Sequence, residues 1–290
     1  MLELSPHPGG VWGSAVPMNL MGEVAIQRGA LTEAEDWFRR SLDVTEQAES
    51  RGFPGPMSYA WHGLGEIAFA HGDLAAATAW YRHARHLARR CGAPDIEALA
   101  PLSLVRTYLL SLPTGALRPA AKALLERGCA VATRCGFSLA IVRAALLEAE
   151  AYMRWGTLAE ARAKAEEALH YATTVGRKRE EALARRLLGQ CAQARGAYAE
   201  SEVHLRAALA LLTEMGAALE VARTRALLAE TLAAQADGEP IPAEARALPS
   251  EALVQFTASR AALDLARAEQ MAVSWRERSL VRSGDDTEHH

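Results

Sequence analysis

Two series of glycines recur along the 290-residue chain with a period of about 40 residues. Members of the first series are 43, 43, 41, 40 and 42 residues apart: Gly29, Gly72, Gly115, Gly156, Gly196 and Gly238. Members of the second are 40, 44, 40 and 40 residues apart, with Ser259 or Arg260 in the sixth place: Gly52, Gly92, Gly136, Gly176 and Gly216. A period of this size is typical of repeat architectures, in which each unit buries its apolar face against its neighbours.

The stretch 58–92 has the pattern of one complete unit. Its first half places Trp61, Leu64 and Ala68 at the spacing of an amphipathic helix. Gly72 interrupts this pattern, and a second apolar face follows: Leu74, Ala77, Trp80, Tyr81, Ala84 and Leu87. Glycine suits the left-handed conformation that ends a helix, so the two series predict two antiparallel helices per unit.

The composition favours an all-α chain. Half of the residues are apolar, only 6% are aromatic, and no stretch alternates like a strand. The net charge of −3 gives no electrostatic reason to expect nucleic acid or an anionic membrane. We therefore predict an irregular lead-in over 1–16, a repeat domain over 17–283 and a disordered tail over 284–290. The repeats are expected at 17–52, 58–92, 98–136, 139–176, 179–216 and 217–259, with a capping helix over 260–283.

The second unit resembles a tetratricopeptide repeat (TPR) at the positions that define that family, namely Trp61, Leu64, Gly65, Gly72, Leu74, Ala77, Tyr81 and Ala84. The resemblance implies a right-handed α-solenoid of about six helix-turn-helix repeats. Two successive units also begin alike, with TEMGAALEVARTRALLAE and TASRAALDLARAEQMA. Such long repeats are similar to the MalT-like arrays of bacterial signal-transduction ATPases and transcription activators, where they act as sensor or partner-binding regions.

Proline-containing segments and an irregular third repeat weaken the pattern locally. The linker GFPGP, which starts at Gly52, is expected to be non-helical. In the third repeat Tyr108 stands where the register expects a small residue, so either its turn holds an insertion or the packing opens there. In the sixth repeat ADGEPIPAEARALPS is expected to form a long connection, with the following helix starting near Glu251.

The sequence contains no catalytic motif of the P-loop, serine hydrolase or zinc protease type. We therefore expect no enzyme activity, catalytic residue, cofactor or metal site. His83 and His86 lie one turn apart on a helix, but no third ligand is nearby in the sequence. The four cysteines form no CxxC pair, and the N-terminus has no signal-peptide pattern, so a cytoplasmic protein is expected.

The sharpest candidate site is a row of equivalent positions on the first helices, which line the concave groove in TPR proteins. This acidic row comprises Glu23, Glu66, Glu150, Gln190 and Glu230. One turn to either side, the same face adds Asn19, His62, Arg186, Ile26, Phe69 and Met153. These glutamates are expected to be exposed charges with little effect on stability. They suit a basic or amphipathic peptide, although glutamate is also an ordinary surface residue of helices.

The function predicted from these observations is a non-catalytic, regulatory scaffold that binds a protein or peptide in its concave groove. The alternative is a small-molecule-sensing segment of a larger MalT-like activator or signalling ATPase, which a closed, aromatic-lined pocket would favour. Chaperone-binding TPR domains hold a carboxylate with Lys and Asn in this groove. Because only Asn19 is available here, a chaperone C-terminus is not expected.

Overall fold

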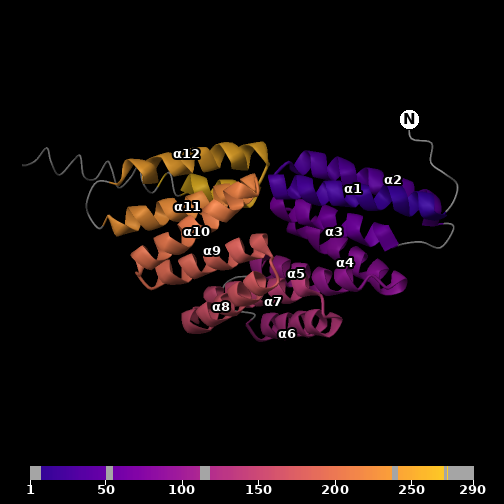
Figure 1. Ribbon diagram of the computed structural model, residues 1–290, viewed down its shortest axis with the longest axis horizontal. Coiled ribbons are helices and arrows are strands. Elements are labelled where there is room, and N and C mark those ends of the chain that lie inside the picture. The colour runs from indigo at the N-terminus through magenta and orange to yellow at the C-terminus, as the bar shows by residue number, and fades with distance from the viewer. Residues whose placement is uncertain (1–7, 50–54, 112–117, 237–240, 271–272, 274–290) are drawn as a thin grey trace, which may run out of the picture.

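The computed structural model describes residues 8–49, 55–111, 118–236, 241–270 and 273, and within these ranges it contains helices and no strands. The helices form antiparallel pairs stacked into an α-solenoid (Figure 1). They are α1 (Pro8–Arg28), α2 (Leu31–Glu49), α3 (Gly55–Ala70), α4 (Leu74–Cys91), α5 (Pro94–Ser111), α6 (Arg118–Cys135), α7 (Ser138–Arg154), α8 (Leu158–Thr174), α9 (Lys178–Ala194), α10 (Tyr198–Glu214), α11 (Ala218–Gln235) and α12 (Ala243–Ala258). A final helical segment follows over 262–270. The predicted solenoid of six helix pairs with a closing helix is thus confirmed.

The two glycine series mark the helix ends as predicted. Each glycine of either series that the structure describes has a positive φ, as at Gly72 (81°) and Gly92 (67°). Arg260, with φ 50°, takes the sixth place of the second series. The α3–α4 turn is completed by Asp73, whose Oδ1 accepts a hydrogen bond from the backbone N–H of Ala76 at 2.9 Å. Gly52, Gly115 and Gly238 lie outside the described residues.

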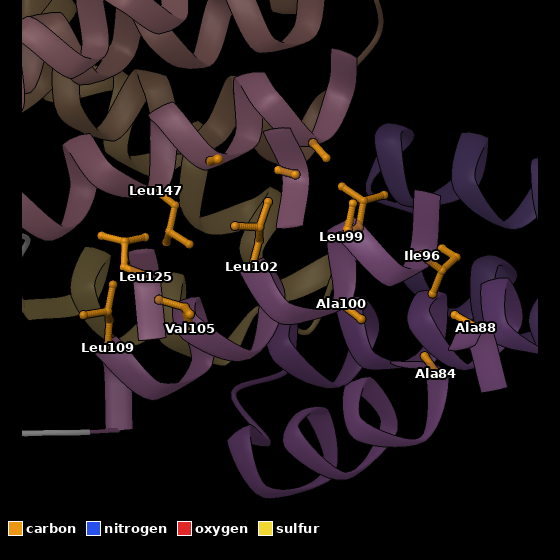
Figure 2. Packing of buried hydrophobic residues seen from close by; sticks show 14 of the residues in the cluster. Ala84, Ala88, Ile96, Leu99, Ala100, Leu102, Val105, Leu109, Leu125 and Leu147 are labelled. Carbon is orange, nitrogen blue, oxygen red and sulfur yellow. The ribbon is translucent and has the colours of Figure 1, made fainter. Parts of the chain in front are cut away.

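The core runs between the two layers of helices. The largest cluster extends from α4 to α7 around α5, and Figure 2 shows Leu102, Val105 and Leu109 of α5 beside Leu125 and Leu147. Alanine fills many of the buried positions, because its small side chain lets neighbouring helices approach closely. The apolar residues therefore bury their surface between successive repeats, as a repeat architecture requires.

Three sequence predictions at proline-containing segments are wrong. The expected lead-in over 1–16 is helical from Pro8, since a proline in the first turn gives up no helical hydrogen bond. The expected non-helical linker ends earlier, because α3 already begins at Gly55. The expected long connection in the sixth repeat is helical from Ala243, and α12 continues through Pro249, which is buried with Leu248. This burial offsets part of the cost of a proline inside a helix.

The third-repeat turn over 112–117, the segment 237–240 and the tail over 284–290 lie outside the described residues. Within the predicted cap over 260–283, the structure describes a helix over 262–270.

The first and last repeats meet, so that the solenoid closes on itself (Figure 1). Ser259 Oγ donates a hydrogen bond to the carbonyl oxygen of Gly29 at 2.9 Å, across 230 residues of sequence. The α3–α4 turn meets the final helical segment, where a Cβ added at Gly72 would lie 3.4 Å from Leu263 Cγ. These contacts hold the two ends of the solenoid together beside its inner side.

Candidate functional site

The inner side of the solenoid holds a cavity of about 580 Å³. Its walls come from the first helix of repeats two to six (α3, α5, α7, α9 and α11), from Phe256 of α12 and from the final helical segment. Leucines form much of the apolar surface, together with the aromatic rings of Phe69 and Phe256. Seven arginines and five carboxylates also line it, namely Arg106, Arg143, Arg154, Arg179, Arg186, Arg223, Arg267, Glu66, Glu150, Glu220, Glu230 and Asp264. The cavity is therefore not uniformly acidic.

Glu66 lies in a network of polar contacts at one side of this cavity. Arg106 Nη2 donates to both of its carboxylate oxygens at 2.8 Å, and Tyr81 donates its hydroxyl at 2.7 Å. Ser103 Oγ donates to the same carboxylate at 3.1 Å, while the Arg106 guanidinium carbon stands 3.9 Å from the centre of the Phe69 ring. Burial opposes ionisation, but Arg106 and the other cations hold the pKa of Glu66 well below its usual range.

His62 closes this network as a neutral group. Its Nε2 lies 3.1 Å from Ser103 Oγ, and its side chain is buried. Burial lowers the pKa of His62 to about 4, because the protonated ring would lose its hydration there, and the nearby Glu66 only partly opposes this effect. His62 therefore supports Glu66 from inside the repeat and does not line the cavity.

A second network surrounds Glu220 on α11. Its carboxylate accepts from Arg186 at 2.5 Å, from Arg223 at 2.9 Å and from Arg179 at 3.3 Å. Arg223 continues to Asp264 of the final helical segment at 2.7 Å. Although burial favours the neutral acid, the three arginines hold the pKa of Glu220 well below its usual range. The network ties α9, α11 and the final segment together around the cavity.

Two charged residues of the cavity wall lack such partners. Within the part of the chain that the structure describes, Glu150 and Arg154, both on α7, form no hydrogen bond or ion pair through their side chains. Burial raises the pKa of Glu150 above its usual value, and Arg106 and Arg186 oppose that rise from a distance. Arg154 is exposed in the last turn of α7. These two groups remain available to a ligand.

The structure brings seven of the eleven predicted site residues to the cavity: Glu66, Phe69, Glu150, Met153, Arg186, Gln190 and Glu230. The other four are all in the first two repeats. Asn19 is buried and donates from Nδ2 to the Pro56 carbonyl at 3.0 Å, and His62 has the internal role described above. Ile26 packs against the core of the first two repeats, and Glu23 is exposed.

Sequence reasoning missed most of the arginines and Glu220. A signal for two of them was present, because Arg143 and Arg223 stand seven residues before Glu150 and Glu230. Residues seven apart lie on the same face of a helix, so extending the face by two turns would have included them. The expectation that the glutamates are simple exposed charges fails at Glu66, whose side chain is 21% exposed and fully engaged.

Within the described residues there is no group of three side chains that could hold a metal ion, and no helix is both long and apolar enough to span a bilayer. The sequence matches no protein-family model and no curated protein.

Solved structures resemble the chain in fold. One is a Rap protein complexed with the Competence and Sporulation Factor, at 13% identity and a TM-score of 0.66, covering 91% of this chain and 70% of that one. Another is NprR in complex with its cognate peptide NprX, at 16% identity and a TM-score of 0.63, covering 91% and 73%. A signal transduction ATPase from Pyrococcus horikoshii with a tetratricopeptide repeat sensor matches at 11% identity and a TM-score of 0.50, covering 95% and 45%. The chain thus has the fold of tetratricopeptide-repeat proteins.

Proposed function

We propose that the chain is a non-catalytic regulatory module that binds a short peptide in its central cavity. The observation that carries this proposal is the cavity itself, which combines apolar walls with charges of both signs on the inner side of the solenoid. Its volume of about 580 Å³ falls within the range of ligand-binding pockets. The similar fold of NprR, solved with its cognate peptide, supports a peptide as the ligand. The unpaired cysteines favour a cytoplasmic location.

The charged residues of the cavity indicate which kind of peptide would fit. Glu66 and Glu220 are already neutralised by arginines, so they offer little to a ligand. Glu150 is available to an ammonium or guanidinium group, and Arg154 to a carboxylate. The leucines of the cavity wall suit apolar side chains. The ligand that fits these features is an amphipathic peptide with one cationic group near Glu150, and this proposal is narrower than a generally basic peptide.

The peptide can be found with the full chain and a mixture of short peptides, by recovering bound species on size-exclusion chromatography and identifying them by mass spectrometry. For a peptide found in this way, Glu150→Gln is expected to weaken binding about tenfold or more, because a desolvated charge pair is lost. Binding to the parent chain should also weaken as the pH falls toward the raised pKa of Glu150, since the carboxylate is then protonated.

A matched control is Glu148→Gln, which removes the same charge from the same helix outside the cavity. This variant should bind like the parent chain and keep its pH dependence. Equal affinities for the parent chain and Glu150→Gln, at neutral and at acidic pH, would contradict the assignment of Glu150.

A small-molecule sensor within a larger activator or ATPase is the second candidate. The likeness in fold to an ATPase with a repeat sensor, of which this chain spans less than half, favours it. Among the described residues of the cavity wall, however, only Phe69 and Phe256 are aromatic and many are charged, which suits a peptide better. Recovery of a metabolite and no peptide, from mixtures of both, would decide in favour of this candidate.

A further inference from the structure

A second hollow, distinct from the central cavity, lies between α4 and α6 on the outer layer of the solenoid. Its volume is about 670 Å³, and α5 forms its floor. The floor is apolar, with Pro101, Leu104, Val105 and Tyr108, and Val131 of α6 extends it. Tyr108 is the residue that stands where the repeat pattern expects a small side chain. The packing of the third repeat is therefore open on its outer side, and we call this hollow the outer groove.

Two rows of arginine border the outer groove. Arg82, Arg85 and Arg89 lie on α4, and Arg127 and Arg134 lie on α6. Residues seven apart on a helix are about 10 Å apart along its axis, so each row spans about two helical turns. Among the described residues that line the groove, none is acidic.

The charge of this region differs from that of the rest of the outer layer. Helix α4 carries four arginines and no acidic residue, and α6 carries four basic residues and one acidic residue. The other outer helices, α2, α8, α10 and α12, each carry more acidic than basic residues. A general excess of arginine in the chain would make every outer helix more basic. The surplus of basic residues is instead confined to α4 and α6 among these outer helices, so a general excess does not explain it.

Most arginines on the outer surface of other repeats have an acidic neighbour one turn away, as Arg39 has in Glu35 at 2.6 Å. At the edge of the outer groove, two arginines pair with Glu97, which is not among the lining residues and stands 3.7 Å from Arg89 and 4.0 Å from Arg134. Arg82, Arg85 and Arg127 make no ion pair with any residue that the structure describes. Three cations with no internal partner thus face a groove with an apolar floor.

We propose that the outer groove binds an acidic amphipathic helix of a protein partner. Such a helix would place its apolar stripe on Leu104 and Val131, and its acidic residues beside the two arginine rows. The apolar floor favours this occupant over nucleic acid, whose phosphate backbone offers no apolar face to it. This site is separate from the central cavity, so its partner and the proposed peptide can bind at the same time.

The test uses the full chain and a labelled synthetic helical peptide that carries glutamates on both sides of a leucine stripe. Fluorescence anisotropy should detect saturable binding that weakens with added salt. The triple variant Arg82→Gln, Arg85→Gln, Arg127→Gln should weaken this binding about tenfold or more, and should reduce its salt dependence. Ala130→Trp, at an exposed position that lines the groove, should block binding without removing a charge.

The matched control removes the same total charge from exposed positions outside the groove, in Arg28→Gln, Arg40→Gln, Arg246→Gln. It should bind like the parent chain, and circular dichroism should show that every variant remains helical. A peptide with lysine in place of glutamate, and one with the same composition in scrambled order, should not bind. The proposal is overturned if the control triple variant weakens binding as much as the groove variant, or if single-stranded DNA binds through these arginines while the acidic peptide does not.

Discussion

A Glu66→Gln variant is expected to unfold about 3 kcal/mol more easily than the parent chain, because it leaves the Arg106 guanidinium without its carboxylate in a largely enclosed site. The substitution also weakens the contacts from Tyr81 and Ser103. Urea denaturation followed by circular dichroism measures this change in the free energy of unfolding. The stability due to Glu66 is present at neutral pH and is lost as the pH falls below 4.5, because its pKa is lowered in the folded state.

The matched control is Glu230→Gln, at the equivalent position of the sixth repeat. Glu230 pairs with Arg267 at 3.1 Å, but the Arg267 side chain is 59% exposed, so water and salt screen the pair. We expect this variant to change the free energy of unfolding by less than about 1 kcal/mol. Equal denaturation midpoints for the two variants would mean that Glu66 is an ordinary surface charge and that the described network does not stabilise the fold.

A Gly65→Leu variant is expected to lose about 3 kcal/mol, the upper part of the usual range for overpacking, or to fail to fold. A Cβ added at Gly65 would lie 2.5 Å from Cε1 of Tyr81, and Tyr81 is fully buried with its hydroxyl on Glu66. The ring therefore cannot move aside without breaking that hydrogen bond. Thermal and urea denaturation test this expectation.

Ala210→Leu provides the control, because Ala210 is exposed in the middle of α10 and accepts the larger side chain without a clash. Its stability should stay close to that of the parent chain. Gly189 should behave like Gly65, since a Cβ there would lie 2.8 Å from Leu205 Cγ. A Gly65→Leu chain as stable as the parent would show that α3 and α4 do not pack through this position.

The repeat period could be predicted from the sequence because it depends on local rules. A positive φ at Gly72 or Gly92 and a small side chain at Gly65 each require a particular residue type, and these residue types recur at equivalent positions in most units. The prediction at Pro249 was wrong for the opposite reason. Local rules place a helix end near Pro249, but α12 continues through this residue, which is buried beside Leu248.

The partners of the charged residues could be predicted less well. The equivalent positions of Glu66 and Glu150 follow from the period, but their different surroundings do not. Arg106 reaches Glu66 from the neighbouring repeat, and Asp264 reaches Arg223 across 41 residues. The closure of the solenoid also depends on its accumulated curvature, so the contact between Ser259 and Gly29 has no signature in either segment alone.

The central claim, that the ligand occupies the inner cavity, is tested most directly by comparing two tryptophan substitutions on α9. Gln190 lines the cavity and Gln193 does not, although both are glutamines at partly buried positions of the same helix. We expect Gln190→Trp to abolish binding of the selected peptide, measured by isothermal titration calorimetry, while Gln193→Trp binds it with the affinity of the parent chain and both variants unfold like the parent. Unchanged binding by a folded Gln190→Trp chain would contradict the claim and place the ligand elsewhere on the solenoid.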